Sequence, residues 1–548
     1  MRVILCAFLA AFLAIPPGPA SASEDTKWNV LIITVDSMRP DHMSLYGYER
    51  ETTPHIAAFA EEALVFENAF ASSASTSPGI VSLLTGYYPP VHAQTGRYSF
   101  YDAELAAPLR VLADEGYRIL GYANDGPTYS DIGIQRRLRE NAIKGRPGLE
   151  HLIDSRRWAE ENGIARPFVA WAHLRETHLP YAPSEESAAR WVDPAQTSPG
   201  VDAVKSHWMI FRPRGVDVPY RNAGEIAFTE EDVAAVRALY DGEMADVDAR
   251  LGRAFADMRE TGLLDDTVIV LTSDHGEELL DHGWVGHAST SYDGKLYDEL
   301  IRIPLIVRLP GRALTGRFDN LVQAVDVMPT VFELLGIAQD RVEPPMQGQS
   351  LLPAVRGERA FSRDYAFAET TVKGWTTPRA ETGQRIVAVR SETRKLIRIP
   401  GENGPQVEAY DLSKDPKELK DVYAARPADF ADLERALDAW AEENRAVAAA
   451  LVLSGAERRV ASLMAALRET DLLAAVRHWE AIAMLERTWG LEVDPFFHHE
   501  PHKSAWQGIR LAASQLIAAA LACHGEGGEL RPIGVGESPE PGDWQCHR

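Results

Sequence analysis

Short apolar runs separated by amphipathic segments most constrain the fold of this chain. VLIITV (residues 30–35), FVAWA (168–172) and VIVLT (268–272) contain no charged residue. Such runs are typical of strands covered on both faces, because a half-exposed strand alternates apolar with polar positions. Helical spacing appears between them, from about Pro54 and over Glu230 to Gly262. The alternation predicts an α/β fold with a large, mostly parallel sheet sandwiched by helices.

The sequence pattern changes after about residue 355. QRIVAVRSETRKLIRI and QVEAYDLSKDP predict short antiparallel strands, and PADFADLERALDAWAEE predicts a helix. We therefore expect a main α/β domain over residues 27–355 and a smaller α+β subdomain over 356–445. Residues 446–548 predict a helical extension that ends in a tail from about residue 526. Residues 184–228 have weak periodicity and are interpreted as an insertion or loop.

The N-terminus has the parts of a secretory signal peptide. Arg2 precedes an apolar run from Val3 to Ile15, and residues 20–22 (ASA) offer a cleavage site. We expect residues 1–22 to be removed near Ala22 and the protein to be exported, either periplasmic or secreted. The alternative is a buried N-terminal helix, which the following prolines disfavour. No later stretch predicts a transmembrane span in the mature chain.

Cysteine content and charge narrow the chemistry. Cys523 and Cys546 remain after the signal peptide, and export favours a disulfide between them, with two free thiols as the alternative. Neither lies near the motifs below, which argues against thiol catalysis.

The chain has 80 acidic and 56 basic residues and a net charge of −24. Nucleic acid is therefore not expected as a partner, because binding its backbone needs clustered Lys and Arg.

The segment SSASTSPGIVSLLTG (residues 72–86) predicts a turn that leads into a helix. Ser77 suits the N-cap, Pro78 the first helical position and Gly86 the C-terminal end. The start of a helix has unpaired N–H groups that favour bound anions. Thr76, directly before the expected cap, is therefore placed beside a position that favours anions.

Acidic residues follow two of the predicted strands. Asp36 ends the first strand, and Asp274 with His275 ends another. Ligands of open α/β sheets bind at the carboxyl ends of the strands. Two carboxylates, an imidazole and a hydroxyl form a donor set for a hard or borderline divalent cation. The Asp-His pair alone would favour a turn or a salt bridge over a metal site.

Longer motifs give these residues a family context. Five segments resemble, in this order, motifs of the sulfatases, a family of the alkaline phosphatase superfamily. They are NVLIITVDSMRPDHMSLYGY, HLRETHLPYAP, LLDDTVIVLTSDHGEELLDHGWVGH, IRIPLIVRLPG and RKLIRI…EAYDLSKDPKELKDV. The resemblance extends over about residues 28–445, and the last hundred residues have no counterpart in it. It implies the sulfatase-like α/β fold with a smaller C-terminal α+β lobe.

The resemblance also implies one divalent metal between two strand ends, with Ca, Mg, Mn and Zn as candidates. Its ligands would be Asp36, Asp274 and His275. Thr76 occupies the position of the sulfatase nucleophile, which also contacts the metal.

Further residues match substrate-binding positions of the family. His178 and His287 match histidines that bind the transferred group or protonate the leaving oxygen. Arg39 is a substrate-binding candidate that also fits a pair with a nearby acid, and Lys295 is another, within the local insertion SYDGK. For His173 we expect a structural role.

Departures from the family pattern change the expected chemistry. Sulfatases usually carry Cys-x-Pro-x-Arg, whose Cys becomes formylglycine, whereas residues 76–80 here are Thr, Ser, Pro, Gly and Ile. No formylglycine is therefore expected, and Ser37 replaces a second adjacent acid. A threonine ester cannot collapse as hydrated formylglycine does and must be cleaved by water. This route is open to an activated hydroxyl and favours phosphorus over sulfur.

The sequence thus predicts an exported, metal-dependent, sulfatase-like hydrolase or transferase that acts on phosphate or sulfate esters through Thr76. Small-molecule, glycan and lipid-headgroup esters are all expected substrate classes. Two alternatives stay open: a sulfatase that works without formylglycine, and an inactive sulfatase fold that binds an anionic glycan, lipid headgroup or protein.

Overall fold

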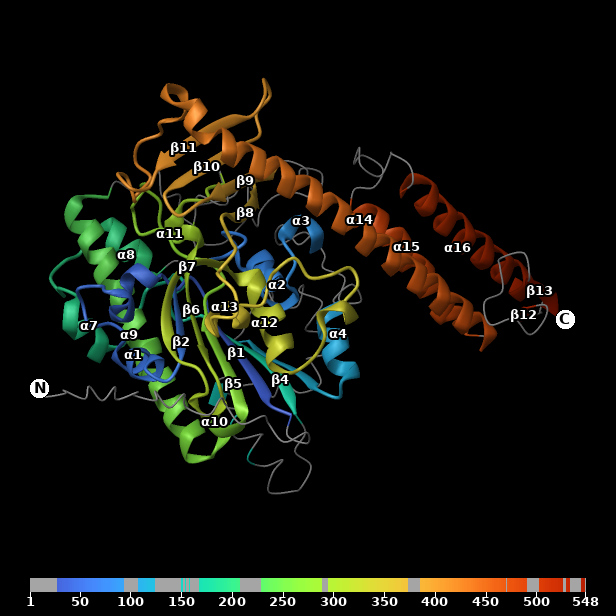
Figure 1. The fold of residues 1–548 in the computed structure, drawn as a ribbon, viewed down its shortest axis with the longest axis horizontal. Coiled ribbons are helices and arrows are strands. Elements are labelled where there is room, and N and C mark those ends of the chain that lie inside the picture. Colours follow the sequence, from blue (N-terminus) through green and yellow to red (C-terminus); the bar gives the residue numbers. More distant parts are fainter. Residues whose placement is uncertain are drawn as a thin grey trace, which may run out of the picture.

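The computed structural model of the protein describes residues 27–547 with internal gaps. The gaps are residues 93–106, 124–148, 151–152, 154–156, 158–166, 207–227, 288–293, 373–384, 470, 490–501, 526–528 and 533–543. The predicted signal peptide, residues 1–22, lies outside the described residues. Figure 1 shows an α/β body from which a helical arm extends to one side.

The body is built on a seven-stranded sheet in the order β3-β4-β1-β5-β6-β2-β7. Its strands are β1 (Asn29–Val35), β2 (Leu64–Phe70), β3 (Arg118–Ala123), β4 (Phe168–Leu174), β5 (Thr267–Thr272), β6 (Arg302–Arg308) and β7 (Gly316–Gln323). β1 is parallel to its neighbours β4 and β5, whereas β6 is antiparallel to both β5 and β2. The predicted mostly parallel α/β sheet is therefore confirmed. Sequence analysis did not predict β7.

The helices are α1 (Pro54–Ala60), α2 (Thr76–Thr85), α3 (Pro89–His92), α4 (Ala107–Asp114), α7 (Glu185–Trp191), α8 (Pro199–Ser206), α9 (Glu230–Glu260), α10 (Leu263–Asp266), α11 (Asp298–Ile301), α12 (Val327–Leu334), α13 (Leu352–Val355), α14 (Ala431–Arg468), α15 (Leu472–Trp489) and α16 (His502–Gly525). The arm consists of α15, α16 and the second half of α14 (Figure 1). α14 crosses the domain boundary predicted at residue 445. None of the described helices combines the length and apolar content needed to cross a membrane.

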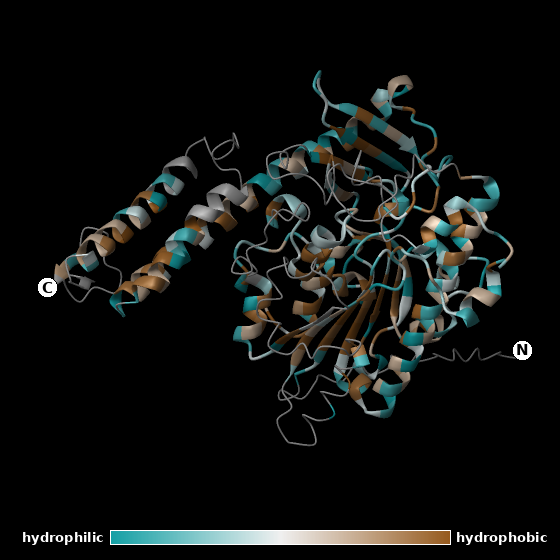
Figure 2. Ribbon diagram, turned by 180° about the vertical axis from the view of Figure 1, so that it is seen from behind, coloured by the Kyte–Doolittle hydropathy of each residue, from teal (hydrophilic) through white to brown (hydrophobic). Residues whose placement is uncertain are grey.

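Alternate residues of β1 enter two different cores. Val30 and Ile32 pack in one core with α2 and α12, and Leu31 and Ile33 pack in the other with α1 and α9. Figure 1 shows these helix pairs on opposite sides of the sheet, and Figure 2 shows the apolar residues concentrated along its strands. Both faces are buried, so the strand is apolar throughout. Each such side chain contributes roughly 1.5–3 kcal/mol to stability.

The register of the central strands brings their carboxyl ends to one edge. Thr34 of β1 pairs with His173 of β4 and with Thr272 of β5. Asp36 and Asp274 each follow this level by two residues, on adjacent strands. This edge of the sheet therefore carries the acids that the sequence singles out.

A second sheet of four antiparallel strands packs beside the body. It consists of β11 (Gln406–Asp411), β10 (Arg394–Ile399), β9 (Arg385–Arg390) and β8 (Ala366–Thr371), of which β8 was not expected from sequence. Lys395 of β10 is fully buried, and its Nζ lies 2.8 Å from Asp298 Oδ1 and 2.7 Å from Glu418 Oε1. Asp298 begins α11, so this cluster fastens the small sheet to the body.

The structure corrects the interpretation of residues 184–228 as an insertion or loop. α7 begins after Ser184, whose Oγ accepts a hydrogen bond from the Ser187 N–H, and α8 follows. Both helices pack on α9. Helices of two turns contain too few apolar repeats to give a clear period, which explains the weak signal. Residues 207–227 lie outside the described part of the chain.

The structure also corrects the interpretation of the last residues as a tail. β12 (Glu529–Pro532) pairs antiparallel with β13 (Trp544–His547). A disulfide joins Cys523 of α16 to Cys546 of β13, as predicted. Strands of four residues are too short for alternation to reveal them in a Gly- and Pro-rich segment.

Replacing Lys395 would leave Glu418 without this cation and Asp298 with Arg390 alone. We expect Lys395→Met to lower the free energy of unfolding by about 3–5 kcal/mol, as when one partner of a buried ion pair is removed. Urea denaturation followed by circular dichroism measures this loss. Lys414→Met is the matched control, because Lys414 is 74% exposed and the loss of its surface pair should change the free energy of unfolding little. Equally small losses for both variants would contradict the role of the buried cluster.

Candidate active site

Helix α2 carries Thr76 as its first residue. Ser75 is the N-cap, and Gly86, with a φ of 71°, ends the helix. The prediction of Ser77 as the cap is therefore wrong by two positions, whereas the prediction for Gly86 is confirmed. Pro78 is tolerated in the third position because the N–H groups of the first turn have no acceptor within the helix. Thr76 lies in the turn where free N–H groups and the helix dipole favour negative charge.

Gly79 lets α2 approach the end of β5. A Cβ at this position would lie 2.4 Å from the carbonyl oxygen of Asp274, a separation that only glycine avoids. The close approach brings Thr76 Oγ1 to 3.2 Å from His275 Nε2. The candidate nucleophile thus lies beside the loop after β5, which carries two of the predicted metal ligands, Asp274 and His275.

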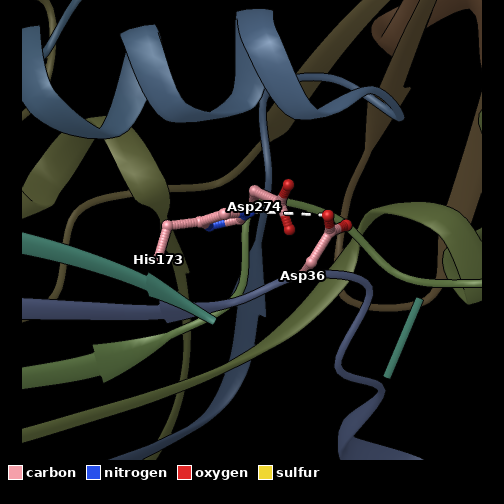
Figure 3. Close-up of side chains that lie close together, drawn as sticks. All are labelled: Asp36, His173 and Asp274. Atoms are coloured by element: carbon pink, nitrogen blue, oxygen red, sulfur yellow. Dashed lines mark ion pairs between the residues drawn. The ribbon is translucent and has the colours of Figure 1, made fainter. Parts of the chain in front are cut away.

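Two carboxylates and a histidine converge at the edge of the sheet. Asp36, His173 and Asp274 are buried, and their potential ligand atoms lie within 4.8 Å of one another (Figure 3). His173 Nε2 lies 3.4 Å from Asp36 Oδ2, the ion pair marked in Figure 3. The structure therefore places His173 among the candidate ligands, although sequence reasoning gave it a structural role.

His275 lies against the same carboxylates. Its Nε2 is 3.8 Å from Asp36 Oδ1 and 3.5 Å from Asp274 Oδ2. Its Nδ1–H donates to the Gly276 carbonyl at 2.7 Å, because a carbonyl can only accept. In the neutral ring, Nε2 therefore directs a lone pair at the carboxylates and Thr76.

The hydrogen bonds of Asp274 show that the cluster fits a cation. Its Oδ1 accepts from the N–H groups of Ser37 and His275, at 3.2 and 3.0 Å. Its buried Oδ2 accepts no hydrogen bond from the described residues. A buried carboxylate oxygen without a donor is costly, and a bound cation would supply the missing partner. The carboxylate, imidazole and hydroxyl donors suit a hard or borderline divalent cation.

Burial and charge act in opposite directions on the titratable groups. Burial alone would raise the pKa of Asp36, but the surrounding histidines, His178 first, hold that pKa well below its usual range. Burial lowers the pKa of His178 to about 3 and that of His287 to about 3. Without a bound ion, both of these rings are therefore neutral at neutral pH.

Both histidines predicted for the transferred group lie beside this cluster. The ring of His287 is 5.0 Å from that of His178 and 4.8 Å from that of His275. His178 Nδ1–H donates to the Leu179 carbonyl at 2.6 Å. His287 Nδ1 lies 2.8 Å from Oε1 of the fully buried Glu277. Each ring is thus oriented through Nδ1.

The backbone around His287 is constrained. His287 has a φ of 42°, in the left-handed region that non-glycine residues rarely adopt. A Cβ on the preceding Gly286 would lie 2.0 Å from Leu179 Cδ1. The loops that carry His287 and His178 are therefore fitted against each other, and such local strain is typical of functional sites.

Arg39 is engaged by other groups. Its guanidinium donates to the Asp41 and Asp281 carboxylates and to the Glu277 carbonyl. The expected pair with a nearby acid is therefore confirmed. Lys295 Nζ lies over the Tyr297 ring, 5.9 Å from its centroid. Substrate binding by Arg39 and Lys295 stays a prediction.

A polar cavity of about 590 Å³ lies beside Arg39, between the body and the small sheet. Arg302, Arg390 and several carboxylates line it. Among the described residues that line it, none is a candidate metal ligand. This cavity is therefore distinct from the carboxylate cluster.

Sequence reasoning missed three residues that contact the site. Arg175 Nε lies 3.5 Å from Asp36 Oδ2, and Thr177 Oγ1 donates to the Asp36 carbonyl. Glu277 orients His287, as described above. Arg175 and Thr177 belong to the loop after β4, in the same motif as His178, so the place that the resemblance gives to His178 is the signal that could have found them.

Comparison with known proteins gives this arrangement a context. Residues 28–337 match the family model described as Sulfatase, and residues 286–445 match that described as N-sulphoglucosamine sulphohydrolase, C-terminal. Arylsulfatase K of Mus musculus is 22% identical over 471 residues, which cover 78% of this chain and 82% of that protein.

Two solved structures show the same fold. The phosphonate monoester hydrolase of Agrobacterium radiobacter has a TM-score of 0.57 and 23% identity, and the match covers 77% of this chain and 96% of that one. A protein solved in complex with its substrate D-glucosamine-2-N,6-O-disulfate has a TM-score of 0.53 and 18% identity, over 77% and 98% of the two chains. At these identities the likeness shows the fold alone.

Substitution of Gly79 tests the close approach of α2 to Asp274. We expect Gly79→Ala to displace the helix or the Asp274 backbone and to weaken binding of a divalent cation by roughly 10–100-fold, as for other residues that position ligands. Isothermal titration with Mn²⁺ or Zn²⁺ measures this affinity. Gly508→Ala in α16 is the control, because a Cβ there meets nothing within 4 Å. Unchanged affinity in the Gly79 variant would show that the approach is not needed.

Proposed function

The chain belongs to the sulfatase family of ester hydrolases, and from this premise we propose that it is a metal-dependent hydrolase or transferase of phosphate esters with Thr76 as its nucleophile. Among the compared proteins, one is by name an arylsulfatase and another a phosphonate monoester hydrolase. Membership of the family therefore leaves the choice between sulfur and phosphorus to the residues of this chain.

The position of Thr76 carries the proposal. Its hydroxyl lies in the first turn of α2, 3.2 Å from His275 Nε2, next to the buried Asp36 and Asp274. A hydroxyl beside a helix N-terminus and a cation site is suited to attack an anionic ester and to form a covalent intermediate.

One divalent cation would be held by Asp36, Asp274, His275 and the Thr76 hydroxyl. The His173 ring lies beside these groups. When bound, such a cation lowers the pKa of a coordinated hydroxyl and neutralises a non-bridging oxygen of the substrate. The N–H groups of the first turn of α2 add donors for the charge that develops in the transition state.

In the first step, Thr76 loses its hydroxyl proton to solvent, and its oxygen attacks phosphorus in line as the bond to the leaving oxygen breaks. His287 is the better proton donor to that oxygen, because the Glu277 carboxyl group lies 2.8 Å from its Nδ1 and can share a proton with the ring. The Nδ1–H of His178 is occupied by the Leu179 carbonyl, so its Nε2 carries a lone pair in the neutral ring. A well-placed proton donor contributes on the order of 10²–10⁴-fold to the rate.

In the second step, water or a second alcohol attacks the phosphorus of the threonine ester and releases Thr76. Formylglycine sulfatases release sulfate by collapse of the hydrated aldehyde, and threonine has no second hydroxyl for that route. This difference supports phosphorus as the element transferred. Hydrolysis of sulfate esters through Thr76 is the second candidate, supported by the match of residues 286–445 to a sulphohydrolase C-terminal model.

We also propose that the protein is exported. The signal-peptide pattern of residues 1–22 and the disulfide between Cys523 and Cys546 support an oxidising compartment. The substrate would then be a small-molecule, glycan or lipid-headgroup ester of that compartment. A related fold with a sulfated glucosamine as its substrate supports sugar esters within this range.

Substitution of Thr76 tests the nucleophile. We expect Thr76→Ala to abolish turnover of an aryl phosphate, and Thr76→Ser to keep part of it, because serine retains the hydroxyl. Assays with an aryl phosphate, a phosphodiester and an aryl sulfate, each with Ca, Mg, Mn and Zn, identify the preferred ester and metal. Turnover of the sulfate alone would refute the phosphorus preference. Full activity of the alanine variant would refute the nucleophile, and no turnover by the folded wild type would favour a binding protein.

The role of Glu277 and His287 is tested by the leaving group. We expect Glu277→Gln to slow hydrolysis of phenyl phosphate by roughly 10²-fold or more, because glutamine cannot share a proton with His287. Hydrolysis of 2,4-dinitrophenyl phosphate should change little, because that leaving group departs without a proton. Steady-state kinetics with both esters measures the difference. An equal loss on both esters would show that Glu277 acts on folding or metal binding instead.

A further inference from the structure

Arg175 stands at the rim of the carboxylate cluster. Its Nε lies 3.5 Å from Asp36 Oδ2. Among the described arginines, Arg175 is the one that forms an ion pair with Asp36. Its Nε is buried and makes no hydrogen bond to any described residue, while the side chain as a whole is 30% exposed. The guanidinium therefore faces the cluster at one end and solvent at the other, with donor capacity left for a ligand.

Backbone contacts fix the loop that carries this arginine. The Asp36 N–H donates to the Leu174 carbonyl at 2.8 Å, and Thr177 Oγ1 donates back to the Asp36 carbonyl. The His178 N–H donates to the Arg175 carbonyl at 3.2 Å, which places Arg175 and His178 on one turn. The position of Arg175 relative to Asp36 and His178 is thus built into the end of β4.

The charge of Arg175 acts on both histidines beside the cluster. Burial is the main cause that lowers the pKa of His178 and of His287, and the positive charge of Arg175 contributes at both rings. The guanidinium therefore lies within electrostatic reach of His287, the proposed proton donor, and of His178.

The site needs a further positive charge of its own. One divalent cation would only balance the charges of Asp36 and Asp274. Ile80, where sulfatases usually carry an arginine, is fully buried in the apolar core. The guanidinium of Arg39 already forms ion pairs with Asp41 and Asp281.

We propose that Arg175 binds a non-bridging oxygen of the transferred group and so selects phosphate monoesters, which are dianions, over monoanionic esters. A phosphate monoester carries roughly two negative charges near neutral pH, whereas sulfate esters, phosphodiesters and phosphonate monoesters carry one. Guanidinium groups bind phosphate oxygens through charge-assisted, often paired hydrogen bonds. The assignment rests on the proposed function of the same site and names its substrate class.

Two esters with one leaving group test the assignment. Phenyl phosphate and phenyl methylphosphonate differ only in that a methyl group replaces one charged oxygen. We expect Arg175→Gln to lower kcat/KM for phenyl phosphate by roughly 10–100-fold, the usual effect of losing a hydrogen bond to a charged group. The kcat/KM for phenyl methylphosphonate should change by less than about threefold. Arg175→Lys should recover part of the loss, because it restores the charge without the paired donors.

Arg250→Gln is the matched control. Arg250 pairs with Glu176 of the same loop, so its loss disturbs the loop without touching the cluster. The ratio of the two kcat/KM values should stay unchanged in this variant. If Arg250→Gln changed this ratio as much as Arg175→Gln does, the assignment would be overturned. Equal losses of kcat/KM for the two esters in Arg175→Gln would also overturn it.

Binding separates this assignment from the proposed reaction. Isothermal titration of the Thr76→Ala variant with phenyl phosphate measures binding without turnover. We expect the double variant Thr76→Ala, Arg175→Gln to bind phenyl phosphate at least tenfold more weakly, which is within the range of a lost hydrogen bond to a charged group. That loss without turnover by the wild type would support Arg175 and refute the proposed reaction. Unchanged affinity in the double variant would refute the assignment whatever the wild type does.

Discussion

The burial of two carboxylates side by side is the constraint on which the rest of the site depends. Asp36 and Asp274 are each 1% exposed, at the ends of neighbouring strands. Two buried negative charges are strongly destabilising unless cations or donors compensate them. His173, whose Nε2 lies 3.4 Å from Asp36 Oδ2, supplies part of this compensation, and Oδ2 of Asp274 still has no hydrogen-bond donor among the described residues. A divalent cation would satisfy both carboxylates, and Thr76 lies where it would share that cation.

The candidate residues that follow strands were predictable from sequence because their signals are local. An apolar run that ends in an acid identified Asp36 and Asp274 without knowledge of the sheet order. His173 and Arg175 were not recognised as part of the site, because their proximity to Asp36 depends on β4 lying next to β1. Sequence separation conceals this pairing, and one sequence does not reveal it.

The start of α2 was misplaced for a different physical reason. Residues 75, 76 and 77 are Ser, Thr and Ser, and all three types are good N-caps, so local preference does not choose among them. The choice is consistent with the packing of Gly79 against the Asp274 backbone, a long-range contact. Short elements were missed for a related reason, since α7 and β12 contain too few residues to show a period. β8 is buried along most of its length and therefore lacks a clear alternation.

The central claim is that Thr76, with a cation held by Asp36 and Asp274, forms a covalent phosphoryl intermediate. Rapid acid quench of the enzyme with an aryl phosphate, followed by peptide mass spectrometry, tests this most directly. We expect a phosphoryl adduct on the peptide that contains Thr76, present with the divalent cation and absent after chelation. Steady turnover with no adduct at any time point, or an adduct on another residue, would contradict it.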